Sequence, residues 1–228
     1  TNMTEEELVE EATGFVEQGF SKYKMKVGMN FGQEEKEDVK RVAAVREAVG
    51  DDIEVYVDAN MGYNVKQAIR MTRIFEEYNV GWLEEPVLAD NITGLAEVTR
   101  ASDIPIATGE NEYTKYGFRD LIQNRCAAII QPDSLIMGGI TEFMKVAAVA
   151  QAHDLPVAPH GNQDVHVHLV SAIPNGLTVE YYSNSTDPMW ERMFEYTLPV
   201  ENGFVSPPER PGIGIQLNEE ALAPQRIH

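Results

Sequence analysis

Apolar residues along this chain fall into two alternating patterns, short continuous runs and longer segments with apolar positions three or four residues apart. The short runs are bounded by Gly, Pro, Asn or Asp, as is typical of buried parallel strands. They lie at residues 23–28, 53–60, 80–86, 104–110, 127–133, 156–161 and 177–182. The segments between them have the spacing of amphipathic helices. Regular alternation of strand and helix predicts an α/β fold with a parallel sheet.

A helix is expected at the start of the chain, over residues 4–19. Thr4 and Glu7 have the spacing of a capping box, and Gly19 is expected to end the helix. With 228 residues and 43% hydrophobic content, the chain is within the size of one α/β barrel.

Charged side chains stand at or near the ends of the predicted strands, 20 to 32 residues apart. They are Lys26, Asp58, Glu84, Glu110, Asp133 and His160, with Glu180 following. One strand, one helix and two loops fill about this length, and all strands of a (β/α) barrel end at the same mouth. The sequence therefore predicts a TIM-like barrel with these side chains gathered at one site.

Three consecutive predicted strands end in carboxylates, at Asp58, Glu84 and Glu110. A single one could be a solvated loop residue or a helix cap. Three at the same structural position favour a metal site. Oxygen ligands alone suit a hard cation, Mg²⁺ before Mn²⁺, and suit zinc poorly.

Lys24 and Lys26 are two residues apart in an apolar run, so in a strand both face the same side. If that side is the barrel interior, their mutual repulsion should lower the pKa of each and make a general base. The alternative is that Lys22, Lys24 and Lys26 form the charged face of an edge strand.

Asp133 and His160 end consecutive predicted strands. If they are adjacent, the carboxylate would orient the imidazole and raise its pKa, giving a second acid/base group. A purely structural histidine is the alternative. His166 and His168 imitate the HxH pair of metal-dependent amidohydrolases, but residues 164–172 are expected to form a helix, on which positions i and i+2 point apart.

Net charge and cysteine content limit the partners. The formal net charge of −19 argues against nucleic acid and anionic membranes, because nothing would neutralise the phosphates. The single cysteine, Cys126, excludes an intramolecular disulfide and suits a reducing cytoplasm. We therefore expect a cytoplasmic location and no membrane partner.

Six short motifs resemble, in order and spacing, the mandelate racemase subgroup of the enolase superfamily, and the resemblance covers essentially the whole chain. The motifs are KMKVG at 24–28, DAN at 58–60, WLEEP at 82–86, GEN at 109–111, QPD at 131–133 and PH at 159–160.

The resemblance implies a role for each residue of the predicted site. The three carboxylates would bind Mg²⁺, Lys26 would be one base with the other lysine beside it, and His160 with its aspartate would be the second acid/base group. Glu180 would contact the substrate carboxylate. Asn60 and Asn111 would be accessory residues that bind the substrate.

The implied reaction is Mg²⁺-dependent abstraction of the proton alpha to a carboxylate, through an enediolate. We expect dehydration of an acid sugar to a 2-keto-3-deoxy acid. Racemisation or epimerisation of a 2-hydroxy acid by the same residues stays open, and a non-catalytic metal-binding or assembly domain is the alternative of another class.

The family's barrel has eight strands and follows an N-terminal α+β capping domain. This sequence begins with the helix that would follow the first barrel strand, so we expect a (β/α)7β barrel domain without its first strand and without the cap. Residues 1–210 would form the catalytic barrel and residues 211–228 a tail returning toward the cap. The full-length enzyme is expected to be a homo-oligomer that acts on a small carboxylate substrate.

Overall fold

The computed structural model describes residues 3–182 and 190–226. Its strands are β1 (Lys22–Lys26), β2 (Glu54–Asp58), β3 (Val80–Glu84), β4 (Ile106–Thr108) and β5 (Ile129–Ile130). The helices before β5 are α1 (Glu5–Glu17), α2 (Met29–Gly32), α3 (Glu35–Val49), α4 (Val65–Glu76), α5 (Ile92–Ala101) and α6 (Thr114–Gln123). After β5 come α7 (Ile140–Gln151), α8 (Gln163–Ala172), α9 (Trp190–Met193), α10 (Glu219–Leu222) and the 3₁₀ turn η1 (Ala223–Gln225).

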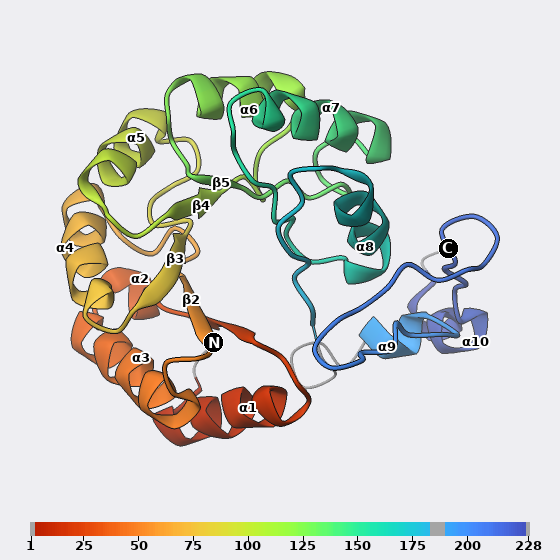
Figure 1. Ribbon diagram of the computed structural model, residues 1–228, viewed down its shortest axis with the longest axis horizontal. Coiled ribbons are helices and arrows are strands. Elements are labelled where there is room, and N and C mark those ends of the chain that lie inside the picture. Colours follow the sequence, from red (N-terminus) through yellow and green to blue (C-terminus); the bar gives the residue numbers. More distant parts are fainter. Residues whose placement is uncertain (1–2, 183–189, 227–228) are drawn as a thin grey trace.

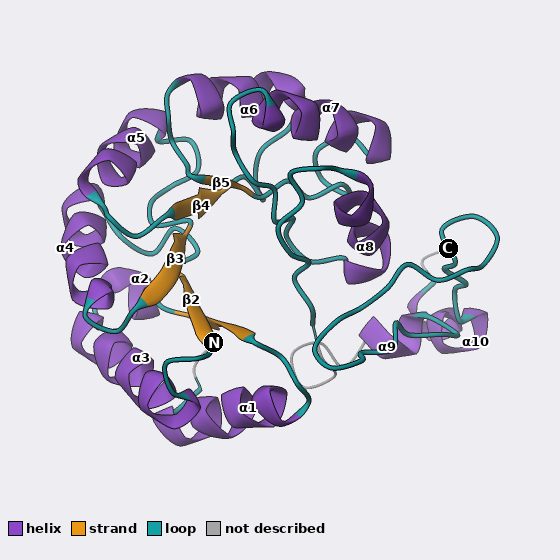
Figure 2. Ribbon diagram, viewed as in Figure 1, coloured by secondary structure: helices purple, strands orange, loops and turns teal. Residues whose placement is uncertain are grey.

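The strands form one parallel sheet in the order β1-β2-β3-β4-β5, and the larger helices ring it on the outside (Figure 1). The strands lie at the centre of that ring (Figure 2). The register pairs Lys26 with Asp58 and Asp58 with Glu84, so the carboxyl ends of the strands meet at one level. This confirms the predicted α/β barrel and explains why residues far apart in sequence share a site.

The sixth and seventh predicted strands are shorter than the pattern indicated. At residues 156–161 the ladder is reduced to single bridges from Val157 to Ile130 and to Gly176, and Gly176 lies one residue before the predicted run 177–182. Pro156 and Pro159 flank Val157, and each lacks the N–H that a longer ladder would use. The two segments still follow β5 around the barrel, so the predicted path of the chain is correct and the predicted strand lengths are wrong.

Helix α1 begins as its sequence indicates. Thr4 caps it, with reciprocal bonds between its hydroxyl and the Glu7 N–H and between the Glu7 carboxylate and the Thr4 N–H, which confirms the capping box. The last helical residue is Glu17, and Gly19 lies just beyond the C-cap with φ of 90°. Leu8 and Ala12 face inward, where the helices pack on the strands around a continuous apolar core.

The barrel interior below the mouth is filled by a separate apolar layer. Its members are Tyr56, Trp82, Ala107, Ile129 and Ala158. The rings of Tyr56 and Trp82 stack with centroids 3.6 Å apart. Gly81 makes this possible, since a Cβ there would lie 2.5 Å from the Tyr56 ring. This apolar layer packs inside the barrel beneath the charged side chains of the mouth.

The C-terminal segment 190–226 lies outside the ring of helices (Figure 1). It is tied to the barrel by the Asn202 and Gly203 turn, which packs against the backbone of Gly19, and by His168, whose Nε2 lies 2.9 Å from the Ile213 carbonyl oxygen. The assignment of residues 211–228 to a tail that returns to a cap stays a prediction. Among the described residues, no helix has the length and apolar character needed to cross a membrane.

Candidate active site

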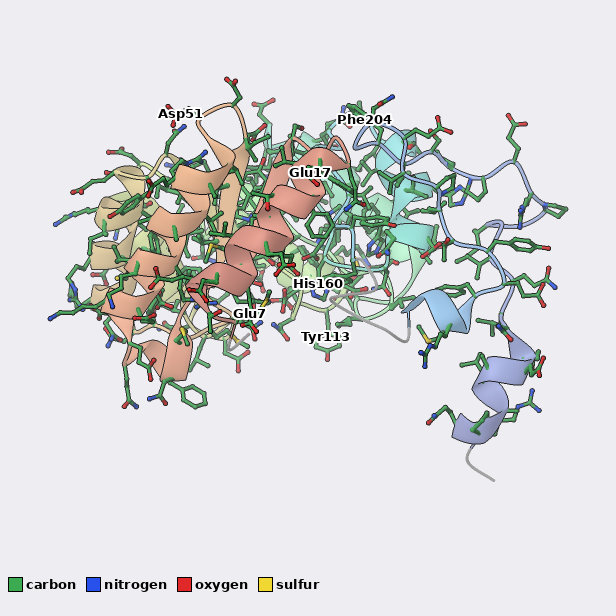
Figure 3. The ribbon with its side chains drawn as sticks, turned by 90° about the horizontal axis from the view of Figure 1, so that it is seen from below. Glu7, Glu17, Asp51, Tyr113, His160 and Phe204 are labelled. Carbon is green, nitrogen blue, oxygen red and sulfur yellow. The ribbon has the colours of Figure 1, made fainter. Side chains whose placement is uncertain are left out.

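The predicted site residues gather at the carboxyl ends of the strands. Figure 3 shows His160 and Tyr113 toward one end of the barrel, while Glu17 and Asp51, which precede β1 and β2, lie at the other end. Apart from Lys24, which lies within β1, these side chains end a strand or follow a strand or bridge closely, as the spacing predicted. The fold thus delivers one acid/base or ligand group per βα unit to a common mouth.

Asp58, Glu84 and Glu110 form a compact acidic triad. One carboxylate oxygen from each lies within 4.8 Å of the others, and all three side chains are buried. Glu110 Oε2 is buried without a hydrogen-bond partner. Buried carboxylates are costly unless a cation or donors compensate them. An all-oxygen set with an unsatisfied inward atom fits Mg²⁺ or Mn²⁺, so the triad can hold the predicted metal ion.

Burial and the close approach of several carboxylates raise the pKa of two of them. Burial, together with the charges of Asp58 and Glu180, raises the pKa of Glu84 to about 7, although Lys24 opposes the rise. Burial and the charge of Glu110 raise the pKa of the neighbouring Glu85 to about 8. Without a metal ion, protons therefore take over part of the charge compensation.

Lys24 and Lys26 both contact carboxylates of the site, so they do not form a solvated charged face, although β1 is the first strand in the sheet order. Lys24 Nζ lies 2.7 Å from Glu84 Oε1 and 2.6 Å from Glu180 Oε1, and Lys26 Nζ is paired with Asp58. Burial lowers the pKa of each lysine, but the facing carboxylates raise it more, so both pKa values lie above the usual range. Repulsion from Lys24 does lower the pKa of Lys26, as expected, but the facing carboxylates outweigh it, so the predicted net lowering is wrong.

Asp133 and His160 form the predicted dyad. Asp133 Oδ2 lies 3.1 Å from His160 Nδ1, which leaves Nε2 directed toward Tyr182 Oη at 3.3 Å and Glu110 Oε2 at 3.6 Å. Burial lowers the pKa of His160, but the Asp133 hydrogen bond and the charges of Glu180 and Glu110 outweigh it and raise the pKa to about 9. A pKa of about 9 favours the protonated imidazole at neutral pH, and Nε2 is the ring nitrogen that faces the triad.

The three predicted accessory residues also reach the site. Glu180 accepts hydrogen bonds from Lys24 and, at 2.6 Å, from the Gly161 N–H. Burial opposes its ionisation, but the charges of Lys24 and His160 lower its pKa to about 2. Asn60 Nδ2 donates to Glu110 at 3.3 Å, and Asn111 Nδ2 donates to Glu85 at 2.9 Å. Both asparagines therefore orient carboxylates around the triad.

Sequence reasoning missed three residues that belong to the site. Glu85 is buried beside the triad and adopts a φ of 39°. Asn162 donates to both oxygens of Asp133 at 3.0 Å, and Tyr182 faces His160. Asn162 follows His160, and Tyr182 follows Glu180, by two positions, so the pattern that linked the two lysines could have found them.

His166 and His168 lie on a helix, which argues against the alternative that they form a zinc-binding HxH pair. Residues 163–172 form α8, as expected for 164–172, and its two histidines have separate environments. His166 is fully buried between two loops, whereas His168 contacts the Ile213 carbonyl on another side of the helix. They cannot bind one zinc ion together.

The arrangement places one acid/base group at each end of the triad. Lys26 contacts Asp58 at the β2 end, and His160 stands beside Glu110 at the β4 end. A carboxylate substrate bound over the triad would thus have the Lys26 amine group on one side and the His160 imidazole on the other. This geometry suits removal of a proton alpha to the carboxylate followed by protonation elsewhere on the substrate.

Comparison with known proteins agrees with this geometry. The chain is 38% identical over 216 residues to 3,6-anhydro-alpha-L-galactonate cycloisomerase of Streptomyces coelicolor, covering 95% of this chain and 58% of the relative. It is 36% identical over 206 residues to L-talarate/galactarate dehydratase of Salmonella typhimurium, covering 90% and 50%. The crystal structure of L-talarate dehydratase from Polaromonas sp. JS666, complexed with Mg and L-glucarate, superposes with a TM-score of 0.89 at 36% identity, covering 97% and 60%.

The chain thus spans between half and three fifths of the length of these relatives. Residues 7–221 match the family described as enolase C-terminal domain-like. With the barrel, the acidic triad and this match together, the chain belongs to the enolase C-terminal domain-like family.

Proposed function

We propose that this chain carries the catalytic site of a Mg²⁺-dependent dehydratase that converts an acid sugar into a 2-keto-3-deoxy acid. The observation that carries the proposal is the acidic triad flanked by Lys26 and His160. Relatives named as L-talarate or galactarate dehydratases support the same reaction class.

Lys26 is the proposed base. The neutral amine is the form that acts, and Lys26 would reach it once Asp58, whose charge raises its pKa, is engaged by a metal ion instead of by Nζ. Nζ then accepts the proton from the alpha carbon, and the electrons of that C–H bond form the carbon–carbon double bond of the enediolate. Mg²⁺ held by Asp58, Glu84 and Glu110 would supply positive charge that stabilises the substrate carboxylate as charge develops there. Lys24, paired with Glu84 and Glu180, stays protonated and adds fixed positive charge beside the substrate.

His160 is the proposed acid. Its pKa of about 9 keeps it protonated at neutral pH, and Asp133 holds Nδ1 so that Nε2 faces the site. As the beta C–O bond breaks, the departing hydroxyl takes the Nε2 proton and leaves as water. The resulting enol then becomes the 2-keto acid. Glu180 is proposed to hold the substrate, in accord with its place between Lys24 and the His160 loop.

A screen of aldonic and aldaric acids with semicarbazide detection of 2-keto acids tests the proposal. The parent protein should form a keto acid from at least one substrate in the presence of Mg²⁺. His160→Asn should lose keto-acid formation but keep exchange of the alpha proton, while Lys26→Ala should lose both. Lys22→Ala is the matched control, because Lys22 lies on the same strand and pairs with Glu54 away from the triad.

A cycloisomerase is the second candidate, favoured by the relative from Streptomyces coelicolor. Mass spectrometry separates the two, since dehydration removes the mass of one water molecule and cycloisomerisation leaves the mass unchanged. Loss of optical rotation without a keto acid or a new isomer would instead indicate racemisation. Mg²⁺ binding without any turnover would indicate a non-catalytic domain.

A further inference from the structure

His166 lies on α8, buried behind the acid/base dyad rather than in the mouth of the barrel. Its Nε2 is 3.1 Å from the Ser134 backbone nitrogen and 2.9 Å from Ser134 Oγ, and its Nδ1 is 2.6 Å from the Gly161 carbonyl oxygen. Ser134 directly follows Asp133, and Gly161 directly follows His160. One side chain therefore joins the neighbours of both dyad members.

The partners of His166 fix its protonation state. A backbone N–H can only donate, so Nε2 must offer its lone pair to Ser134. A carbonyl oxygen can only accept, so Nδ1 must carry the proton that it donates to Gly161. Only the neutral Nδ1–H form satisfies both contacts. Burial also lowers the pKa of His166, which favours the neutral form, and the ring is stacked on Phe143 with centroids 5.8 Å apart.

The loop after β5 and the loop after residue 160 have few other direct links. Asn162 Nδ2 spans them with bonds of 3.0 Å to both Asp133 oxygens, and the dyad itself contributes the contact of 3.1 Å. Gly161 also donates its N–H to Glu180, so a shift of this residue would move a second site carboxylate. The bonds to His166 are thus placed where a small loop movement would misalign the imidazole of His160.

We propose that His166 is a positioning residue that clamps these two loops and thereby sets the orientation of the Asp133/His160 dyad. The catalytic part of this inference rests on the proposed function, because the dyad is the acid of that reaction. Among the described residues, the hydrogen bonds of His166 go to Ser134 and Gly161 and not to the triad, so we expect it to act through these two neighbours of the dyad. Its loss should impair the step that uses His160 and spare the step that uses Lys26.

Substitutions can remove the two halves of the clamp separately. His166→Asn retains a donor near the Nδ1 position for Gly161, and His166→Gln retains an acceptor near the Nε2 position for Ser134. His166→Phe keeps an aromatic ring against Phe143 and removes both hydrogen bonds. His168→Gln is the matched control on the same helix, because the hydrogen bond of His168 goes to the Ile213 carbonyl, away from Ser134 and Gly161.

Amide hydrogen exchange measures the clamp without any catalytic assay. In His166→Phe, exchange of the Ser134 amide should accelerate about five- to tenfold, while amides in the middle of α3 keep the parent rate. His166→Gln should restore part of the Ser134 protection, and His168→Gln should leave it unchanged. Parent-like exchange at Ser134 in His166→Phe would overturn the clamp.

Catalysis provides the second readout. His166→Phe should lower the kcat of dehydration about tenfold or more, while exchange of the alpha proton by Lys26 stays within about twofold of the parent. An equal fall in both rates would show a general structural role and overturn the positioning role. If the parent turns over no substrate, the proposed function fails, and the amide exchange result alone decides whether the clamp exists.

Nitrogen NMR of the imidazoles covers the case in which His166→Phe does not fold. In the parent protein, His166 should show a protonated Nδ1 and an unprotonated Nε2. A protonated Nε2 would be incompatible with the Ser134 N–H contact and would overturn the proposal.

Discussion

Protonation of Glu84 should compete with metal binding, which makes Mg²⁺ affinity depend on pH in a calculable way. The metal-free site is the correct reference state, and there burial and the nearby charges of Asp58 and Glu180 raise the pKa of Glu84 to about 7 against the opposing effect of Lys24. A protonated carboxyl cannot ligate the ion, so binding below this pKa must displace a proton. Affinity is therefore lost as the pH falls through about 7.

The magnitude follows from the titration of one group. With a pKa near 7, Glu84 is about one-tenth ionised at pH 6 and about nine-tenths ionised at pH 8, so the apparent association constant should rise about tenfold between them. Above pH 8 the curve should flatten with respect to this group. Lys24→Met removes the cation that lowers the pKa of Glu84, so the rise should move to higher pH.

Isothermal titration calorimetry with MgCl₂ measures this dependence. At pH 6, binding should release about one proton, and titrations in two buffers with different ionisation enthalpies count it. Glu110→Gln should weaken binding at every pH, because it removes one of the three carboxylates. An affinity that is constant between pH 6 and pH 8 would refute the reasoning about Glu84, and unchanged affinity in Glu110→Gln would remove Glu110 from the site.

Two further predictions concern stability. Tyr63→Phe should lower the free energy of unfolding by about 1.5–3 kcal/mol in urea denaturation, because its hydroxyl donates to the buried Asp38 at 2.8 Å, whereas the exposed Tyr113→Phe should change it by less than about 0.5 kcal/mol. Gly203→Ala should accelerate amide exchange in residues 199–206 more than Gly212→Ala accelerates exchange in the turn around residue 212. Both glycines have positive φ, but a Cβ at Gly203 would lie 2.2 Å from the Gly19 carbonyl oxygen, whereas a Cβ at Gly212 would meet nothing within 4 Å. Equal acceleration of amide exchange by the two substitutions would contradict the importance of the close approach between Gly203 and Gly19.

Sequence reasoning located the site well because one feature, the strand end, is repeated along the chain. Asp58 and Glu84 end β2 and β3, Glu110 lies two residues after β4, and the parallel sheet brings the three together. The capping box at Thr4 was equally readable, since it depends on contacts between residues three apart. Most of the architecture could therefore be predicted from the spacing of residues within elements and from the repeat of strand and helix along the chain.

Contacts between residues on different strands and loops could not be predicted from the sequence in the same way. The pKa values of Lys24 and Lys26 depend on which carboxylates face them, and spacing shows only that the lysines share a face. The strand lengths at 156–161 and 177–182 depend on available partners, and Pro156 removes one donor from the ladder. The role of His166 required knowing that residues 134 and 161 lie together, which no local pattern states.

The central claim is that Lys26 abstracts the proton alpha to a carboxylate bound at the acidic triad. Exchange of that proton with D₂O, followed by NMR over a panel of aldonic, aldaric and other 2-hydroxy acids with Mg²⁺, tests it most directly in the complete protein that contains this chain. We expect deuterium incorporation by the parent and by Lys22→Ala, and a rate about 10²–10⁴ lower in Lys26→Ala. Absence of exchange with every substrate, or exchange by Lys26→Ala at the parent rate, would contradict the account.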